Sequence, residues 1–282
     1  MSDDLPEVRQ ALCEDIGTGD VSAALIPATQ RVKASIISRE PMVVAGIPWV
    51  IATLNAVDPT LQYTWHVQDG DWLSSPQGLC TLEGAARTLL TAERTALNFL
   101  QVLSGTATLT RTYVQAIAGT SAQLLDTRKT LPGLRNAQKY AVRCGGGHNH
   151  RMGLYDAYLI KENHIRACRS LTQAIINAKA QQDGLLIEVE VETLAQCQEA
   201  LNAEPHRILL DNFSLEHLTA AVKMNTARRC TLEASGGITL QNIKAVAETG
   251  VDYISVGDLT KSVRAIDLSL LVEDEPSCLA SY

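Results

Sequence analysis

From residue 106 onward the chain alternates short apolar runs with helical stretches, and this alternation limits the possible folds most. Six apolar runs end in polar, charged or glycine residues: 123–129, 156–163, 185–192, 207–212, 231–237 and 252–258. The segments between them, such as SLTQAIINAKAQQ and SLEHLTAAVKMN, place apolar residues at helical spacing. Strands that alternate with helices indicate parallel βα units. We therefore predict an α/β fold with a six-strand barrel, although this pattern also permits an open sheet.

The segment before residue 106 reads differently. Strand-like pieces at 32–40, 41–47, 61–70 and 78–84 mix with helices expected at 7–16 and 48–56, which is typical of an α+β domain. A helical pattern follows over 86–118, and the Ser104-Gly105 pair predicts a break in it. We place the domain boundary there. The expected domains are 1–105 and 106–282, with the last residues returning to the N-terminal domain.

The charge of the chain excludes one large class of partner. The net charge is −7 and the pI about 5.4, whereas nonspecific nucleic-acid binding needs a broad basic face. Yet the stretch LLDTRKTLPGLRNAQKYAVRCGGGHNHR (124–151) holds six Arg or Lys and one acid, Asp126. A local basic cluster on an acidic protein indicates a pocket for a small anion. We expect no nucleic-acid or membrane partner.

The seven cysteines show no CxxC spacing, which favours a reduced, cytoplasmic protein. The acidic start MSDDLPEVRQ lacks the apolar core of a signal peptide, and no run of apolar residues is long enough to span a membrane.

Ligands of parallel α/β folds bind at the carboxyl ends of the strands, so the residues there are the candidate site. The early ends are basic, with Arg128, Lys129 and Lys161, and the late ends are rich in Ser and Gly. The middle ends carry the acids Glu188, Glu190, Glu192 and Asp211. Arg and Lys bind carboxylates, acids hold Mg²⁺ or sugar hydroxyls, and glycine loops present backbone N–H groups to a phosphate. The pattern predicts one ligand with carboxylates and another with a phosphorylated sugar and a metal.

Simpler interpretations stay open for several of these residues. The glycines of ASGGI could form a plain turn, and the three acids of EVEVE could form a solvated strand face. Arg135, Lys139 and Arg143 lie four apart and could form one solvated helix face. His148 and His150 lack a carboxylate or Cys at zinc-binding spacing, and Cys144 is more typical of a packed thiol than of a nucleophile.

The chain strongly resembles the quinolinate phosphoribosyltransferase (nicotinate-nucleotide pyrophosphorylase, carboxylating) family. The resemblance covers nearly the whole length and is carried by ERTALNFLQVLSG (93–105), LLDTRKTLPGLRNAQKYAVRCGGGHNHRMGLYDAYLIKENHI (124–165), EVEVE (188–192), LLDNF (209–213), EASGGI (233–238) and TGVDYISVGDLT (249–260). One departure is Lys261, where many members have histidine. The resemblance implies an N-terminal α+β sandwich-like domain, an atypical six-strand α/β barrel and a homodimer.

The resemblance also implies a pentosyltransferase reaction. Quinolinate and 5-phosphoribosyl-1-pyrophosphate (PRPP) would give nicotinate mononucleotide, pyrophosphate and CO₂ in NAD biosynthesis, with Mg²⁺ and no prosthetic group. The implied substrate-binding residues are Arg94, Thr127, Arg128, Lys129, His150, Arg151, Lys161, Glu190, Asp211, Ser235, Gly236, Gly237, Ser255, Val256, Gly257 and Asp258.

These residues carry different implied roles. Arg94, Arg128, His150, Arg151 and Lys161 would hold the quinolinate carboxylates, with Arg94 entering the neighbouring subunit's site. The implied catalytic residues are Lys129, which bridges the two substrates, and Glu190 and Asp211, which meet the ribose hydroxyls and Mg²⁺, partly through PRPP and water. The residues at 235–237 and 256–258 would line the 5-phosphate pocket.

Three alternatives remain at this point. A related pyrophosphorylase could act on another pyridine-type acid, and a non-catalytic relative could bind a phosphosugar. A barrel aldolase could use Lys161 as a Schiff base, although a lysine among arginines is more plausible as an anion ligand.

Overall fold

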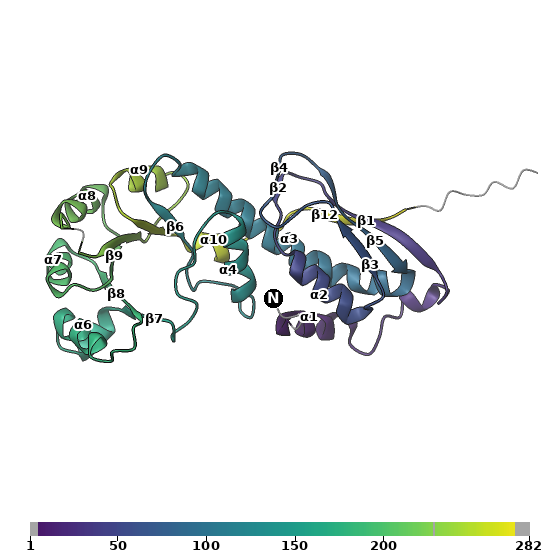
Figure 1. Ribbon diagram of the computed structural model, residues 1–282, viewed down its shortest axis with the longest axis horizontal. Helices are drawn as coiled ribbons and strands as arrows, with labels where there is room; N and C mark the ends of the chain where they lie inside the picture. The colour runs from purple at the N-terminus through teal and green to yellow at the C-terminus, as the bar shows by residue number, and fades with distance from the viewer. Residues whose placement is uncertain (1–4, 228, 274–282) are drawn as a thin grey trace, which may run out of the picture. The chain divides into compact units, whose positions relative to one another are not determined.

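The computed structural model describes residues 5–227 and 229–273, and Cys278 lies outside them. The chain divides into two compact units, one of residues 1–108 with 263–282 and one of residues 109–262 (Figure 1). Among the described residues, no helix has the length and apolar character needed to cross a membrane.

The first unit is built around an antiparallel sheet. Its strands β1 (Arg31–Ser38), β3 (Gln62–Trp65), β5 (Gln77–Ala85) and β12 (Leu268–Val272) pair in the order β12-β1-β5-β3. The short strands β2 (Met42–Val43) and β4 (Trp72–Leu73) form a separate pair. The described C-terminal strand β12 thus pairs with β1, so this unit contains both early and late residues.

Two helices pack on this sheet with apolar side chains, α2 (Ile47–Val57) and the first part of α3 (Ala86–Ala116). Helix α1 (Pro6–Ile16) contacts α2, and a 3₁₀ turn η1 (Ala23–Leu25) follows α1. Leu89, Leu97 and Leu100 of α3 are fully or almost fully buried in one cluster with residues of the sheet. The apolar residues whose spacing predicted this helix therefore form its packed face.

The predicted break at Gly105 is wrong, because α3 is continuous through it. A Cβ at Gly105 would lie 2.1 Å from the carbonyl oxygen of Arg264. The glycine therefore permits close approach of another backbone segment of the same unit rather than a bend. Glycine is tolerated in a helix interior at a cost of about 1 kcal/mol relative to alanine, and this packing explains its presence.

The second unit contains six parallel strands, as predicted. They are β6 (Gln123–Leu125), β7 (Ala157–Ile160), β8 (Leu186–Val191), β9 (Arg207–Asp211), β10 (Thr231–Ser235) and β11 (Tyr253–Ser255). The connecting helices are α4 (Arg135–Cys144), α5 (Glu162–Ala167), α6 (Leu171–Lys179), α7 (Leu194–Ala203), α8 (Leu215–Met224), α9 (Ile243–Glu248) and α10 (Asp258–Lys261). In Figure 1, α6 to α9 lie along the outer side of the strands.

The strand order is β6-β11-β10-β9-β8-β7, in which the first strand of the unit pairs with the last. This is the neighbour order of a barrel. In the described chain no ladder joins β6 to β7, and the free edge of β6 instead forms a bridge between Leu125 and His148. The α/β class and the six-stranded parallel sheet are confirmed, whereas closure into a barrel stays a prediction.

Candidate active site

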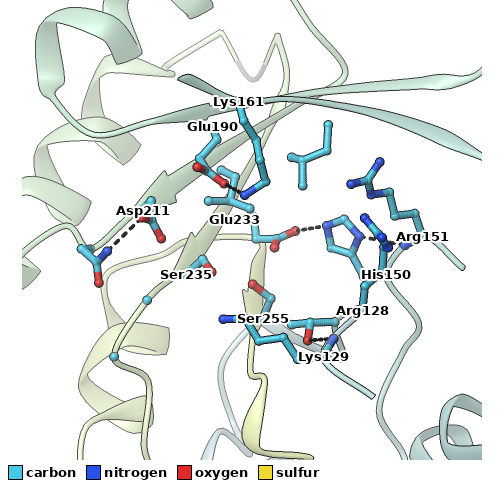
Figure 2. Close-up of a pocket in the computed structure, with 16 residues that line it drawn as sticks. Arg128, Lys129, His150, Arg151, Lys161, Glu190, Asp211, Glu233, Ser235 and Ser255 are labelled. Atoms are coloured by element: carbon cyan, nitrogen blue, oxygen red, sulfur yellow. Dashed lines mark hydrogen bonds and ion pairs between the residues drawn. The ribbon is translucent and has the colours of Figure 1, made fainter. Parts of the chain in front are cut away.

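A pocket of about 490 Å³ opens at the carboxyl ends of the parallel strands (Figure 2). Its lining residues are Thr127, Arg128, Lys129, His150, Arg151, Leu159, Lys161, Glu190, Leu209, Asp211, Asn212, Glu233, Ser235, Gly236, Gly237 and Ser255. Because the strands are parallel, their carboxyl ends meet at one edge and bring side chains from six distant segments together. The residue at which each strand ends therefore determines which side chains lie at that edge.

One side of the pocket is basic, and we call Arg128, Lys129, His150 and Arg151 the basic side. Arg128 and Lys129 follow β6, whereas His150 and Arg151 follow the glycine turn after α4. Burial and the neighbouring charge of Arg128 lower the pKa of Arg151. The Nε atoms of both arginines are buried and have no hydrogen-bond partner among the described residues. Two like charges held together with unused donors are suited to binding a dianion.

His150 is fixed at both ring nitrogens. The Arg151 backbone N–H donates to Nδ1 over 2.7 Å, so Nδ1 is the unprotonated nitrogen. The other nitrogen, Nε2, lies 3.0 Å from a carboxylate oxygen of Glu188 and 3.6 Å from one of Glu233. Burial lowers the pKa of His150, in agreement with a neutral ring that carries its proton on Nε2. Both ring nitrogens therefore already face protein groups.

The carboxyls of Glu188 and Glu233 are fully buried beside this ring. Burial raises the pKa of each to about 7, and Arg207 opposes the shift through its charge, with Nη1 3.0 Å from Glu233. One atom each of His150, Glu188 and Glu233 lies within 4.8 Å of the others. The spacing of these three residues in the sequence does not indicate this cluster. Arg207 already supplies a positive charge to it.

The opposite side of the pocket is acidic. Glu190 and Asp211 end the adjacent strands β8 and β9, and Lys161 forms an ion pair with Glu190. Burial, followed by the charge of Glu190, raises the pKa of Asp211. Two carboxylates that repel each other across a pocket favour a cation between them. Their oxygen donors fit Mg²⁺, which is usually held by one or two carboxylates together with substrate phosphates.

A second, smaller pocket of about 200 Å³ adjoins the first. It is lined by Thr127, Lys129, Ser235, Gly236, Gly237, Ile238, Thr239, Ser255, Val256, Gly257, Asp258 and Lys261. Gly236 has φ +89°, and a Cβ there would lie 2.2 Å from Oδ1 and 2.9 Å from the backbone nitrogen of Asn212. Only glycine fits this turn, which is a loop geometry suited to a phosphate.

Lys129 lines both pockets. Its backbone N–H donates to Thr127 Oγ1 over 3.0 Å, and its carbonyl accepts from Thr260 Oγ1 over 2.9 Å. In the smaller pocket Lys261 pairs with Asp258 over 3.1 Å.

Fifteen of the sixteen predicted substrate-binding residues line one or both pockets. The exception is Arg94, which belongs to the first unit, is exposed and lies 3.8 Å from Glu93. The expectation of a solvated helix face is wrong for Lys139, whose side chain is fully buried in an ion pair with Asp126. Glu188 is buried and therefore does not belong to a solvated strand face. Of the three acids Glu188, Glu190 and Glu192, only Glu192 is exposed.

Sequence reasoning missed Glu233, Asn212, Leu159 and Leu209 as pocket residues. The strand period offered a signal for one of them. Glu233 lies two residues before Ser235 and therefore on the same face of β10. No comparable signal marked Asn212, whose contact with Gly236 depends on tertiary structure.

The fold and the two pockets define a class of protein: an α/β protein in which a basic and acidic pocket adjoins a glycine-rich pocket at the carboxyl ends of parallel strands. Residues 20–104 match the family described as "Quinolinate phosphoribosyl transferase, N-terminal domain", and residues 106–271 match its C-terminal domain. The chain belongs to the quinolinate phosphoribosyltransferase family.

Individual relatives agree with this membership. The chain is 47% identical over 269 residues to "Nicotinate-nucleotide pyrophosphorylase [carboxylating]" of Mycobacterium leprae, covering 93% of this chain and 95% of the relative. It is 43% identical to a "Probable nicotinate-nucleotide pyrophosphorylase [carboxylating]" of Bacillus subtilis over 91% of this chain and 89% of the relative. The solved structure of the nicotinate-nucleotide pyrophosphorylase from Francisella tularensis is similar with a TM-score of 0.92, 46% identity and 95% coverage of both chains.

Proposed function

We propose that this protein transfers the phosphoribosyl group of PRPP to the ring nitrogen of quinolinate and releases pyrophosphate and CO₂. The observation that carries the proposal is the division of one pocket into a basic side and an acidic, glycine-rich side, with Lys129 at both pockets. Quinolinate has two carboxylates and PRPP has a phosphorylated ribose, so each substrate matches one side. Membership of the family supports the same activity.

Arg128, Arg151 and Lys161 are proposed to bind the carboxylates of quinolinate. Their positions in the pocket lining support this role, because guanidinium groups bind carboxylates with paired hydrogen bonds. His150 is proposed to act through its neighbours, since its ring nitrogens face Arg151 and Glu188. Lys161 pairs with Glu190 in the free protein and would be shared with the incoming carboxylate.

The smaller pocket is proposed to hold the 5-phosphate of PRPP. Ser235 to Gly237 and Val256 to Asp258 line it, and backbone N–H groups of such loops bind phosphate without a counter-charge. Lys129 would then lie between the two substrates. Glu190 and Asp211 would receive the ribose hydroxyls and Mg²⁺, and the metal would neutralise charge on the departing pyrophosphate.

The chemistry follows from these positions. The bond between C1 of the ribose and pyrophosphate breaks, and the lone pair of the ring nitrogen forms the new bond to C1. The carboxylates of Glu190 and Asp211 stabilise the positive charge that develops on the ribose. The carboxylate at C2 then leaves as CO₂, because the electron pair left at C2 lies beside the positive nitrogen, and C2 takes up a proton. The ring nitrogen is a weak nucleophile, so alignment of the two substrates is the main contribution of the protein.

An assay with purified protein tests the proposal. Quinolinate, PRPP and Mg²⁺ should give nicotinate mononucleotide, pyrophosphate and CO₂ in equal amounts, whereas nicotinate and nicotinamide should give no product. Turnover of another pyridine acid but not quinolinate would favour a relative with a different substrate. Binding of PRPP by calorimetry without any turnover would favour a non-catalytic phosphosugar-binding protein.

A homodimer with a shared site is also proposed, with Arg94 acting in the neighbouring subunit. Its support is that Arg94 is exposed and that, among residues 5–227 and 229–273, its charged partner is the adjacent Glu93 at 3.8 Å. Homodimers with Arg94→Ala and with Arg128→Ala should each lose most activity at low quinolinate concentration, and mixed heterodimers should recover activity at one site. Heterodimers that form without recovery of activity would contradict a shared site.

A cytoplasmic location is proposed because the six described cysteines are all free thiols.

A further inference from the structure

Helix α4 carries three cations at four-residue spacing, and one of them joins two separate backbone segments of the basic side. The guanidinium of Arg135 donates to the carbonyl oxygens of Arg128 over 3.3 Å and Met152 over 3.1 Å. Its Nε also donates to Thr130 Oγ1 over 3.2 Å. Arg135 therefore connects segment 126–130, which carries Arg128, to segment 148–152, which carries Arg151.

Lys139, one turn further along the helix, connects the same two segments. Its Nζ is fully buried and donates to the Asp126 carboxylate and, over 2.8 Å, to the carbonyl oxygen of His150. Asp126 accepts further bonds from the His150 backbone N–H over 2.8 Å and from Asn149 Nδ2 over 2.6 Å. We call Arg135 and Lys139 the α4 clamp.

The charges on the basic side explain why a clamp is needed. Burial, followed by the charge of Arg128, lowers the pKa of Arg151, so the two positive charges repel each other in the free protein. They stand on two segments that lie outside the helices and named strands. The Asp126 backbone N–H donates to the His148 carbonyl oxygen over 3.1 Å, and the Asp126 carboxylate accepts from His150 and Asn149. The side-chain bonds from α4 add further connections between the same segments.

We propose that Arg135 and Lys139 are positioning residues that set the separation of Arg128 and Arg151, and thereby the affinity for a pyridine dicarboxylate. This inference rests on the proposed function and extends it to residues outside the pocket, since neither clamp residue lines either pocket. Their donors are used within the protein, so the clamp acts on the ligand only through the two arginines.

Two variants test the clamp. Arg135→Lys keeps the positive charge and loses the three-way contact of the guanidinium, so any effect is one of position rather than charge. The double variant Asp126→Asn with Lys139→Met removes the buried pair as a unit, because removal of one partner alone leaves a buried charge and destabilises the fold. Arg143→Met is the matched control: Arg143 lies on the same helix face, is exposed, and donates to the Asn149 side chain over 2.8 Å.

The first measurement uses no ligand. In Arg135→Lys, amide hydrogen exchange of residues 126–130 and 148–152 should be at least about tenfold faster than in wild type, since these segments lose fixed contacts. Exchange in strands β9 and β10 should stay unchanged. In Arg143→Met, exchange of segment 126–130 should also stay unchanged, because Arg143 donates to Asn149 of the other segment. Equal exchange of the two segments in Arg135→Lys and wild type would overturn the clamp whatever the protein's substrate is.

The second measurement uses calorimetry and steady-state kinetics. For both test variants, Kd and KM for quinolinate should rise about tenfold or more, because small misplacements of binding groups are costly. The KM for PRPP should rise much less than that for quinolinate, since Thr127 and Lys129 of the clamped segments line the phosphate pocket but the glycine loops and Asp211 lie outside these segments. Equal losses for both substrates would indicate a general structural role and overturn the proposal. Wild-type protein that binds no quinolinate would instead overturn the proposed function, and the exchange result would still decide whether the clamp holds the two segments.

Discussion

The two sides of the pocket are held in place by different means. The carboxylate–glycine side, which we define as Glu190, Asp211, Ser235, Gly236 and Gly237, stands at the ends of β8, β9 and β10 and at the turn that follows. Backbone ladders pair Ser235 with Asp211 and Glu190 with Leu209, so sheet register fixes their spacing. The basic side stands on two irregular segments that side chains of α4 connect.

This difference has an energetic cause. Strand ends need no side-chain contacts to stay in register, because each residue shares backbone hydrogen bonds with its neighbours. Two arginines that repel each other need fixed contacts around them, and here these come from α4 and from the buried Asp126. Changes on the carboxylate–glycine side should therefore act through the altered residue itself, whereas the basic side can also be disturbed from outside the pocket.

The largest effect is expected from the acids of the carboxylate–glycine side. Glu190→Gln and Asp211→Asn keep the side-chain size but remove the charge that stabilises the ribose, so kcat should fall about 10²- to 10³-fold. Melting temperature should change little. Glu192→Gln is the matched control, because Glu192 follows Glu190 by two residues but is exposed and lines neither pocket. A normal kcat in Asp211→Asn would contradict the catalytic role of the carboxylate–glycine side.

A smaller effect is expected from Arg128→Ala on the basic side. The loss of a charge-assisted hydrogen bond of about 1.5–3 kcal/mol should weaken quinolinate binding about 10- to 150-fold. Isothermal titration with quinolinate measures this directly. Arg229→Ala, which removes an exposed arginine paired with Glu204 at 3.2 Å, serves as control. An unchanged quinolinate affinity in Arg128→Ala would contradict the role of the basic side.

Gly236→Ala should weaken PRPP binding more than Gly237→Ala. Both glycines have positive φ, of +89° and +62°, so both substitutions strain the backbone by about 1 kcal/mol or more. Only at Gly236 does the new Cβ also meet Asn212, and moving that residue disturbs the loop. We expect the KM for PRPP to rise about tenfold in Gly236→Ala and a few-fold in Gly237→Ala. A larger rise in the KM for PRPP in Gly237→Ala than in Gly236→Ala would show that the contact with Asn212 does not determine the loop conformation.

The smallest effect is a pH dependence of stability centred on Glu233. Burial raises the pKa of Glu233 from 4.5 to about 7, so between these values the folded state holds a proton that the unfolded state has released. The contribution of Glu233 to stability is therefore lost as pH rises through this window. The neighbouring Glu188, His150 and Arg207 are present in wild type and in Glu233→Gln alike.

Since Gln does not titrate, the melting temperature of Glu233→Gln relative to wild type should rise by a few °C between about pH 5 and pH 8. Thermal unfolding in a series of buffers measures the difference. A difference that falls with pH would mean that the charge of Arg207 outweighs burial and stabilises the Glu233 carboxylate.

Much of the fold and site could be predicted because both depend on local patterns. The alternation after residue 106 predicts the six parallel strands, and strand ends predict where Arg128, Glu190 and Asp211 lie. The failures have tertiary causes. Gly105 reads as a helix break, but the carbonyl of Arg264 packs against it. Lys139 reads as exposed because its partner Asp126 lies thirteen residues earlier, in the segment that follows β6. Neither contact leaves a periodic signal in the sequence.

The most direct test of the account is a crossed titration of two variants with two ligands. Arg128→Ala and Gly236→Ala are each titrated with quinolinate and with PRPP and Mg²⁺, and the affinities are compared with wild type. If the two sides recognise different substrates, Arg128→Ala should lose affinity for quinolinate alone and Gly236→Ala for PRPP alone, each by about tenfold or more. Equal losses of both ligands in both variants would contradict a pocket with two separately held sides.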